Sequence, residues 1–463
     1  MANQPITSVA VVMVPLPAQG HLNQLLHLSR LVSVYDIPIH FISTTTHTRQ
    51  AKTRVHGWDP LSKTNINFHE FPTPPFNNPP PNPNSSIKFP SQIIPSLHAS
   101  TNLRDPVYKL IQKLSKTTQR IVIIYDSLMA YVVQDIRSIP NAESFCFQSS
   151  SAFTIYSLYW EAVGKPLLPF KACHIENVPL EDCFPLEIQE LVKVLYDVPK
   201  SNTGDIYNTS RLIDGIYLDL LAEAKATGTN KLFAIGPFNP ISLLGTKNQE
   251  NNQNKCLLWL DKQEPNSVLF ISFGTTSSLT DEQINEIAIG LEKSEHKFIW
   301  VLRDADKGDV FEGEIRKAPL PEGYEERVKE RGIIVRDWAP QLEILGHGST
   351  GGFISHCGWN SCMESISLGV PIGAWPMHSD QPGNAFLVTK VLRIGVEVKD
   401  WARRDEVIDS ITVEKVVRRL LGSEEGDEIR KRAKELGEIV RESVVEGGDT
   451  KKEMDSFIAH ITR

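Results

Sequence analysis

Short apolar runs recur along the chain and alternate with stretches that have the spacing of one helix face. The first run covers residues 8–14 and ends at Pro15; residues 21–34 then carry Leu and Val at helical spacing, and residues 37–43 form a second run. A continuous run of β-branched residues suits a strand that is buried on both faces, as in a parallel sheet. The chain therefore begins with a predicted strand–helix–strand unit.

The same pattern returns further along the chain. Strands are predicted at residues 120–125, 267–274, 297–302, 332–338 and 351–358, and helices at residues 281–294, 425–445 and 450–461. We predict an α/β fold with two doubly wound, Rossmann-like parallel-sheet domains that face each other across a cleft. The expected segments are a first domain at 1–244, a polar linker at 245–255, a second domain at 256–445, and a C-terminal helix within 446–463 that packs back on the first domain.

The composition narrows the classes of function. The chain has 463 residues and a net charge of -8, and no basic run that would suit a nucleic-acid backbone. Its six cysteines form no C-x-x-C pair, which is typical of reduced thiols in a cytosolic protein. No apolar run reaches the ~18 residues that a membrane helix needs. We expect a cytoplasmic monomer without a nucleic-acid or membrane partner.

Two strand ends carry residues that suit an anion. After the strand at 351–358, Gly358 permits a tight turn, and Asn360 or Ser361 is predicted to cap a helix that begins at Cys362. The segment SFGTTSS at 272–278 repeats the order of strand, glycine and hydroxyls. Free N–H groups at a helix start bind phosphate, so two such ends suggest a diphosphate. Each turn alone fits an ordinary capped helix equally well, and neither matches a P-loop or a G-x-G-x-x-G fingerprint.

A longer stretch of sequence distinguishes a diphosphate site from ordinary capped helices. Residues 338–381 read WAPQLEILGHGSTGGFISHCGWNSCMESISLGVPIGAWPMHSDQ. This segment resembles the signature box of the plant family-one UDP-glycosyltransferases, and the resemblance extends to PAQGH at 17–21 and WLDKQEPNSVLFISFG at 259–274. It implies the GT-B fold, in which the second domain holds the donor. It also implies an inverting, metal-independent transfer that needs UDP-glucose as donor substrate and no further cofactor.

The resemblance assigns the donor contacts. It places Trp338 against the uracil, Ala339 and Gln341 at the uracil and ribose, and Glu364 at the ribose hydroxyls. The expected diphosphate contacts are His356, Gly358, Asn360, Ser361, Thr275 and Ser277, and the expected sugar contacts are Trp359, Asp380, Gln381 and Ser149. A Gln at the position of Gln381 usually accompanies glucose donors, and xylose stays open. Four neighbours of these positions are expected to be structural: Cys357, Cys362, Trp375 and Met377.

His21 and Asp126 are the candidate catalytic pair. Each follows a predicted strand of the first domain, and each matches the family position of the base or its partner. A hydroxyl is a poor nucleophile at neutral pH, so an imidazole must take its proton during the attack. A buried carboxylate would hold the imidazole and stabilise its charged form. The sequence contains no G-x-S-x-G elbow, which a serine hydrolase of this type would need. Neither of the two candidate anion-binding turns matches the G-x-G-x-x-G fingerprint, which argues against an NAD enzyme.

The residues that bind the acceptor are the most difficult to predict from the sequence. Candidate walls are the Pro-rich surface loop at 71–86, residues 91–100 and residues 147–160, although the last segment reads equally well as core. The second half is most similar to the zeatin O-glycosyltransferase group, which implies O-glucosylation of a zeatin-type cytokinin. The alternatives are O- or C-glucosylation of a flavonoid or another phenol and, more remotely, a non-catalytic nucleotide-sugar-binding protein.

Overall fold

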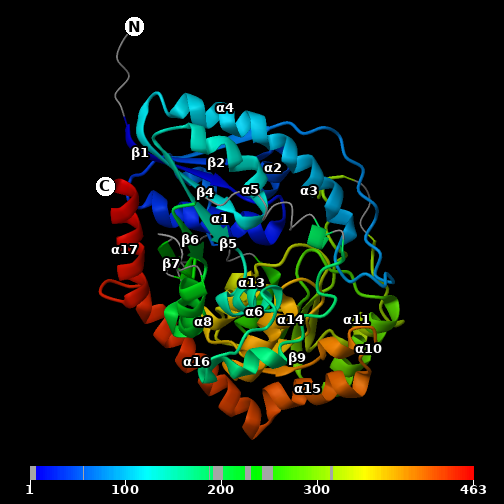
Figure 1. Cartoon of the computed structure of the whole chain (residues 1–463). Coiled ribbons are helices and arrows are strands. Elements are labelled where there is room, and N and C mark those ends of the chain that lie inside the picture. Colours follow the sequence, from blue (N-terminus) through cyan, green and yellow to red (C-terminus); the bar gives the residue numbers. More distant parts are fainter. Residues whose placement is uncertain are drawn as a thin grey trace.

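A computed structural model describes residues 7–55, 57–186, 188–190, 202–224, 231–241, 254–312 and 316–463. Each half of the chain builds one parallel sheet with helices on both faces, and the two halves lie one above the other (Figure 1). This is the α/β architecture that the alternating apolar runs predict. Residues 245–253 of the predicted linker lie outside the described residues, and its last residue, Lys255, begins a helix.

The first sheet has the strand order β3-β2-β1-β4-β5-β6-β7. Its strands are β1 (Thr7–Val14), β2 (Ile39–Thr44), β3 (Ile66–Phe71), β4 (Thr118–Asp126), β5 (Ala142–Gln148), β6 (Gly204–Tyr207) and β7 (Lys231–Ala234). Its helices are α1 (Gln19–Ser33), α2 (Thr45–Thr53), α3 (Ile94–Ser100), α4 (Arg104–Leu114), α5 (Ala130–Val133), α6 (Ala152–Ala162) and α8 (Arg211–Ala224). The strand β1 is central, since Val11 pairs with Ile39 on one side and with Val122 on the other.

The second sheet has the strand order β10-β9-β8-β11-β12-β13. Its strands are β8 (Val268–Ser272), β9 (Lys297–Val301), β10 (Gly332–Val335), β11 (Thr350–Ser355), β12 (Ile372–Ala374) and β13 (Gly395–Glu397). The helices of the second half of the sequence are α9 (Lys255–Leu260), α10 (Asp281–Ser294), α11 (Tyr324–Val328), α12 (Gln341–Leu345), α13 (Trp359–Leu368), α14 (Gln381–Phe386), α15 (Ser410–Gly422), α16 (Glu424–Ser443) and α17 (Asp449–Thr462), of which α17 packs on the first sheet.

Short 3-10 segments complete the described elements: Pro60–Ser62, Ser91–Ile93, Thr101–Leu103, Ser127–Met129, Gln134–Ser138, Phe170–Asn177 and Trp401–Arg403; a π-helical turn spans Leu387–Val391. Residues 72–90 contain no helix or strand, which agrees with the predicted Pro-rich loop. Proline cannot supply the N–H groups that either regular structure needs.

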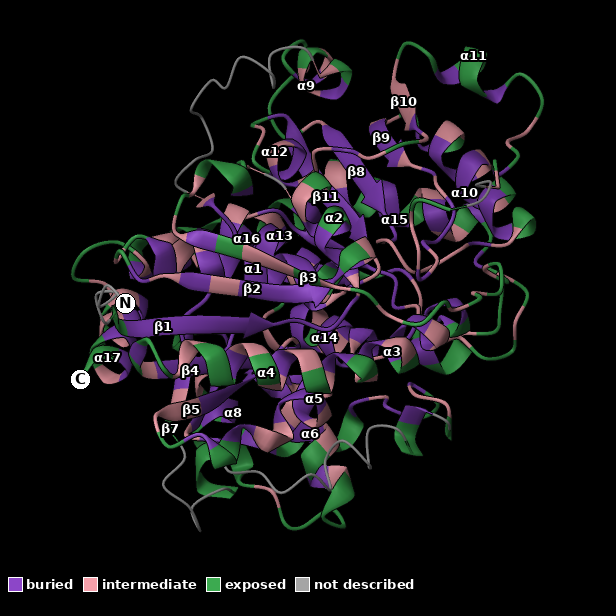
Figure 2. Cartoon of the chain, turned by 90° about the horizontal axis from the view of Figure 1, so that it is seen from above, coloured by how far each residue is buried: buried purple, intermediate pink, exposed green. Residues whose placement is uncertain are grey.

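The buried strands explain the continuous apolar runs. Val11 and Met13 join the core on one face of the first sheet, and Val12 and Val14 join the core on the other face. Successive side chains of a strand point to opposite faces, so a strand covered on both sides must be apolar throughout. Figure 2 shows this burial along β1.

The last helix, α17, belongs spatially to the first half of the chain. Phe457 and Ile461 are fully buried in the same core as Val11, and Glu453 accepts a hydrogen bond of 2.8 Å from the backbone N–H of Ala234 in β7. In Figure 1 the helix lies beside the first sheet after α16 has crossed from the second half. Burial of each such side chain stabilises the fold by about 1.5–3 kcal/mol.

A shared apolar core joins the two halves. Phe153 of α6 stacks on Phe386 of α14 with ring centroids 6.0 Å apart, and Trp359 of α13 lies in the same cluster. The segment 147–160 is therefore largely core, which is one of the two interpretations that its sequence allows. This contact fixes the carboxyl edges of the two sheets close to each other.

Candidate functional site

His21 and Asp126 meet at the carboxyl edge of the first sheet. The strands β1 and β4 are parallel neighbours, so the chain segments that leave them start at the same edge. His21 lies in the first turn of α1 and Asp126 ends β4. Nδ1 of His21 is 2.7 Å from Oδ2 of Asp126. The other carboxylate oxygen accepts the N–H of Leu128 at 3.0 Å, and the carboxylate is fully buried.

The surroundings of His21 set its protonation. Burial lowers the pKa of His21, but the charge and hydrogen bond of Asp126, together with the charge of Asp380, outweigh that effect and raise the pKa above 6.5. In the neutral imidazole the Nδ1 proton is donated to Asp126, which leaves Nε2 as the basic nitrogen. The pair can therefore take a proton from a group that lies next to Nε2.

His356 lies between two glycine turns of the second half. A Cβ atom on Gly274 or on Gly358 would stand 2.5 Å from Nε2 of His356, so only glycine fits at either position, and Gly274 also has a φ of +75°. Burial lowers the pKa of His356 to about 4, which keeps the imidazole neutral. Nδ1 of His356 and Oγ of Ser277 are both buried without a hydrogen-bond partner among the described residues. Such atoms are costly to leave unpaired, and they indicate a polar ligand.

The helix α13 begins earlier than predicted. Gly358 is the N-cap and Trp359 the first helical residue, so Asn360 and Ser361 lie within the first turn and do not cap a helix at Cys362. The prediction of a cap at Asn360 or Ser361 was wrong because both residue types are strong caps. In the structure Gly358 occupies the N-cap position, and no side chain caps the helix. The first N–H groups of α13 have no partner within the helix, as at any helix start.

Trp359 does not lie as expected. Its indole is buried in the core between the two halves, and Nε1 donates to the backbone oxygen of Asn208 at 2.9 Å. The side chain therefore cannot donate to a sugar hydroxyl, and only the backbone N–H of Trp359 stays with the first turn of α13. The neighbouring Cys357 and Cys362 are buried in the same core, as expected of structural thiols.

Glu364 stands at the centre of a buried polar group. Its Oε2 accepts from Nε2 of Gln341 at 2.6 Å, and the same nitrogen lies 3.0 Å from Oγ of Ser361. Asn360 reaches the other carboxylate oxygen at 3.5 Å, and Ala339 is buried where the chain enters α12. Burial raises the pKa of Glu364 to about 7, although the Gln341 hydrogen bond partly opposes this effect. A hydroxyl donor beside this carboxylate would stabilise its ionised form.

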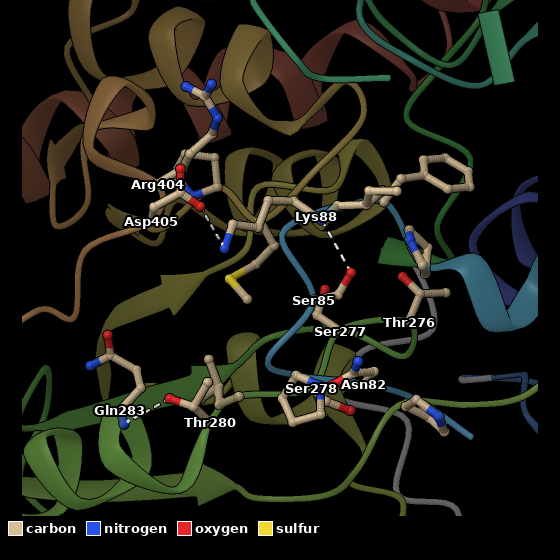
Figure 3. Close-up of a pocket in the computed structure, with 18 of the residues that line it drawn as sticks. Asn82, Ser85, Lys88, Thr276, Ser277, Ser278, Thr280, Gln283, Arg404 and Asp405 are labelled. Carbon is tan, nitrogen blue, oxygen red and sulfur yellow. Dashed lines mark hydrogen bonds and ion pairs between the residues drawn. The ribbon is translucent and has the colours of Figure 1, made fainter. Parts of the chain in front are cut away.

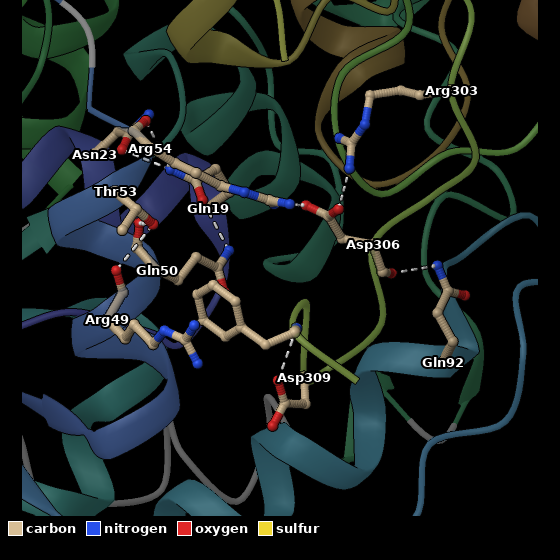
Figure 4. Close-up of polar contacts among 11 residues, drawn as sticks. Gln19, Asn23, Arg49, Gln50, Thr53, Arg54, Gln92, Arg303, Asp306 and Asp309 are labelled. Atoms are coloured by element: carbon tan, nitrogen blue, oxygen red, sulfur yellow. Dashed lines mark hydrogen bonds and ion pairs between the residues drawn. The ribbon is translucent and has the colours of Figure 1, made fainter. Parts of the chain in front are cut away.

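Trp338 carries two guanidinium groups on its ring. Cζ of Arg54 lies 5.0 Å and Cζ of Arg303 lies 5.8 Å from the ring centroid. Both arginines pair with Asp306, and the Arg54 bond, 2.6 Å long, crosses between the two halves of the chain. Figure 4 shows the pairs that Arg54 and Arg303 form with Asp306, and also Gln19, whose amide donates to the backbone oxygen of Arg54 at 3.3 Å.

Of the expected sugar contacts, Asp380 lies near the base. Asp380, at the start of α14, is close enough to His21 for its charge to act on the imidazole. The side-chain oxygen of Gln381 accepts the N–H groups of Met377 and His378 at 2.8 and 3.1 Å. Ser149 follows β5, and its backbone oxygen accepts from Gln24 at 3.1 Å. All these residues lie at the facing edges of the two sheets.

A polar pocket of about 130 Å³ borders this region (Figure 3). The Pro-rich loop and residues 399–407 form its walls and are linked by the ion pair of Lys88 and Asp405, 2.9 Å long. Ser277 and its neighbours in the turn after β8 also line the pocket, as do Trp375 and Met377. These last two side chains pack against a hydrophobic core of the second half of the chain. Neither His21 nor Asp126 lines this pocket.

The described residues contain neither a cluster of metal ligands nor a helix that could span a membrane. No group of three or more His, Cys, Asp and Glu side chains there is arranged to hold a metal ion. Among the helices of the described segments, none combines the length and the apolar character needed to cross a membrane.

Comparison with known proteins assigns the family. Residues 7–240 match the family model "Glycosyltransferase, N-terminal domain", and residues 234–411 match "UDP-glucoronosyl and UDP-glucosyl transferase". A zeatin O-glucosyltransferase of Phaseolus lunatus is 53% identical over 459 residues, which are 99% of this chain and 98% of the relative. A zeatin O-xylosyltransferase of Phaseolus vulgaris is 50% identical over 465 residues, and both chains are covered completely. The chain belongs to the UDP-glycosyltransferase family.

The fold of this glycosyltransferase agrees with that assignment. A UGT transferase from Siraitia grosvenorii, solved in complex with UDP, superposes with a TM-score of 0.76 at 27% identity, over 98% of this chain and 100% of that one. The predicted GT-B architecture and the resemblance to the zeatin group are thus confirmed. The enzyme uses a UDP-sugar as donor and a small molecule as acceptor.

Three residues of this glycosyltransferase were not found by sequence reasoning. Arg54 and Asp306 lie outside every motif, and only the folded chain brings them to Trp338. Asn384 stands three positions after Gln381, just beyond the signature box, on the same short helix as Gln381. Spacing within α14 was the one signal that could have pointed to Asn384, because residues i and i+4 share a helix face and Asp380 precedes it by four.

Proposed function

We propose that the enzyme transfers glucose from UDP-glucose to the side-chain hydroxyl of a zeatin-type cytokinin, with inversion and without a metal ion. Two relatives that match the whole chain at 53% and 50% identity carry names of zeatin O-glycosyltransferases, which supports this acceptor. The observation that carries the chemistry is the contact of 2.7 Å between His21 and Asp126.

Glucose as donor rests on Gln381. Its side-chain oxygen accepts the backbone N–H groups of Met377 and His378, just before α14, so its position is fixed before a donor arrives. The xylosyltransferase relative supports UDP-xylose as the second candidate donor.

The second half of the chain would hold the nucleotide. In this proposal uracil stacks on Trp338 beside Ala339 and Gln341, and the ribose hydroxyls donate to Glu364. The diphosphate would meet His356, Thr275, Ser277 and the first turn of α13 at Gly358, Asn360 and Ser361. The unpaired Nδ1 of His356 and Oγ of Ser277 support a polar ligand at this place. In the same proposal the sugar contacts are Asp380, Gln381 and Ser149.

Transfer would then proceed in one displacement. The acceptor hydroxyl oxygen attacks the anomeric carbon while Nε2 of His21 takes its proton, and Asp126 stabilises the imidazolium that forms. The bond between the anomeric carbon and the diphosphate oxygen breaks on the opposite side, and UDP leaves with the electron pair. An α-linked donor therefore gives a β-glucoside.

The developing charge on UDP would be met by neutral donors of the protein. The N–H groups at the start of α13 and the imidazole N–H of His356 offer hydrogen bonds in a partly buried site, where they are stronger than in water. Both lobes of the site come from one chain, and the enzyme is proposed to act as a monomer.

A product screen tests this function. Purified protein is incubated with UDP-glucose or UDP-xylose and with trans-zeatin, cis-zeatin, dihydrozeatin or a set of flavonoids, and products are identified by mass spectrometry. A hexoside of zeatin that β-glucosidase cleaves is the expected result. Exclusive use of UDP-xylose would show that xylose, and not glucose, is the sugar transferred. Products formed only from flavonoids would overturn the proposal that zeatin is the acceptor. A flavonoid product that resists acid and β-glucosidase would be a C-glucoside.

A further inference from the structure

The side chain of Asn384 joins the two halves of the enzyme next to the sugar end of the site. Asn384 is fully buried in α14. Its Oδ1 accepts from Oγ of Ser151 at 2.8 Å and from Oγ1 of Thr154 at 3.0 Å, both at the start of α6 in the first half. Its Nδ2 donates to Oδ2 of Asp380 at 2.8 Å and to the backbone oxygen of Cys357 at 3.0 Å.

These four bonds leave the amide no freedom. A carboxamide has two acceptor lone pairs and two N–H donors, and each of them is used here. The carboxylate of Asp380 and the carbonyl of Cys357 can only accept hydrogen bonds, so a flipped amide would lose both of the bonds that Nδ2 donates to them. Asp380 and Cys357 therefore fix the orientation of the Asn384 amide, and Ser151 and Thr154 of the first half donate to the oxygen that this orientation turns toward them.

The partners from the first half are themselves rigid. Ser151 is the N-cap of α6 and accepts the N–H of Thr154 at 3.1 Å. The next two N–H groups, of Ala152 and Phe153, donate to the buried carboxylate of Asp214. The helices α6 and α14 approach so closely that a Cβ on Gly383 would stand 2.5 Å from Oγ1 of Thr154.

On the other side, Asn384 holds a group that faces the base. Asp380 is near enough to His21 to affect its protonation, and Cys357 lies between His356 and Gly358 in the turn before α13. One amide thus contacts the carboxylate at the sugar end and the backbone of the diphosphate turn. Ser151 and Thr154 of the first half contact the oxygen of the same amide.

We propose that Asn384 is a positioning residue that orients the carboxylate of Asp380 toward the donor sugar and makes this orientation depend on the contact between the two lobes. The proposal rests on the proposed function, since it takes Asp380 as a sugar contact. It predicts that loss of Asn384 weakens recognition of the sugar more than recognition of the nucleotide.

Two variants test separately the donor nitrogen and the acceptor oxygen of the Asn384 amide. Asn384→Asp keeps an acceptor for Ser151 and Thr154 but has no N–H for Asp380, and it sets a second carboxylate against the first. Thr154→Val removes one donor from the first lobe and keeps the bond to Asp380. Dissociation constants for UDP and for UDP-glucose are measured by calorimetry on each full-length variant, together with kcat, KM and the thermal midpoint.

The expected result is a change in the ratio of the two dissociation constants. Asn384→Asp should weaken UDP-glucose binding and lower kcat by about tenfold or more, the size expected for a lost hydrogen bond to a charged group, and it should weaken UDP binding less than UDP-glucose binding. Thr154→Val should change the same ratio in the same direction by about two- to fivefold. Equal weakening of UDP and UDP-glucose, or an unchanged ratio in both variants, would overturn the proposal.

The variant Asp380→Ala keeps this outcome distinct from a failure of the proposed function. If Asp380→Ala leaves UDP-glucose binding and turnover unchanged, Asp380 is not a sugar contact, and the function assigned to it fails together with the inference. If Asp380→Ala weakens UDP-glucose binding while Asn384→Asp does not, only the inference fails. Should Asn384→Asp not fold, Thr154→Val decides by the same ratio.

Discussion

Nδ1 of His21 lies 2.7 Å from Oδ2 of Asp126, although the two residues are 105 positions apart in the chain. Parallel pairing of β1 and β4 explains the contact, because it brings the residues that end or follow these strands to one edge. The carboxylate is fully buried and the imidazole is partly open to the cleft. This arrangement orients the imidazole and leaves Nε2 for the substrate.

Replacement of Asp126 by Asn should change both the rate and its pH dependence. In the native enzyme kcat/KM should rise with pH through a midpoint above 6.5, because Asp126 and Asp380 raise the pKa of His21 against the effect of burial. Without the Asp126 charge, burial prevails and the midpoint should move to lower pH, with a maximum rate lower by about 100-fold or more. An unchanged profile in Asp126→Asn would contradict the proposed pair.

The same pair predicts a pH dependence of stability. The pKa of His21 is raised in the folded state, so protonation stabilises the fold below pH 6.5 and this stabilisation is lost as the pH rises through the folded-state pKa. Urea unfolding of native protein and of His21→Gln should therefore differ more at low pH than above that pKa. Parallel curves at every pH would show that Asp126 does not bias the protonation of His21.

Glu364 should make donor binding pH-dependent. Burial raises its pKa to about 7, and ribose hydroxyls that donate to it prefer the ionised carboxylate. Affinity for UDP-glucose, measured by calorimetry, should increase by about five- to tenfold between about pH 6 and pH 8. Glu364→Gln serves as the comparison and should bind more weakly with a flat profile. A pH dependence that survives in Glu364→Gln would assign it to another group.

Gly274 offers a test of the His356 site with a matched control. Ala at this position would bring Cβ to within 2.5 Å of the imidazole, and the positive φ of 75° adds strain. Gly447 has a φ of +85° with nothing near its Cβ position, so Gly447→Ala carries the strain alone, about 1 kcal/mol. UDP binding should fall by about tenfold or more in Gly274→Ala and stay unchanged in Gly447→Ala. Equal UDP affinities in the two variants would refute the packing argument.

Asp306 should contribute strongly to the contact between the lobes. Its carboxylate is largely buried and pairs with Arg54 and Arg303, so Asp306→Ala deprives two guanidinium groups of the carboxylate that neutralises them. The free energy of unfolding in urea should fall by about 3 kcal/mol or more. Glu326→Ala, which removes an exposed pair with Lys329, should change it by less than about 0.5 kcal/mol. Equal losses in the two variants would contradict the assignment.

Sequence reasoning predicted the central strands of the two sheets, such as β1, β4, β8 and β11, because their apolar runs are long, and it missed β3, β5, β6, β12 and β13. Each apolar run, such as residues 8–14, can only be a strand buried on both faces or a core segment, and the helical spacing between runs resolves the ambiguity. It failed at the start of α13, where Asn360 and Ser361 imitate caps but lie in the first turn. Local propensity gives way there to the packing of Trp359 between the lobes.

The site was predictable only where residues are grouped in the chain. The signature box places Gln341, Ser361 and Glu364 on two helices of one domain, so their contact follows from the motif. Arg54 and Asp306 are 252 positions apart, and Ser151 and Asn384 are 233 apart. Contacts that depend on how two domains meet have no periodic signal in either domain, which is why the sequence did not indicate them.

The most direct test of the proposed function uses the variant His21→Ala with UDP-glucose and trans-zeatin. Formation of the β-glucoside is followed by mass spectrometry, and UDP binding is measured on the same sample. We predict that product formation falls by at least about 100-fold while the dissociation constant for UDP stays within about twofold of the native value. Glucoside formation at the native rate by His21→Ala would contradict base catalysis by His21 and with it the mechanism proposed for this enzyme.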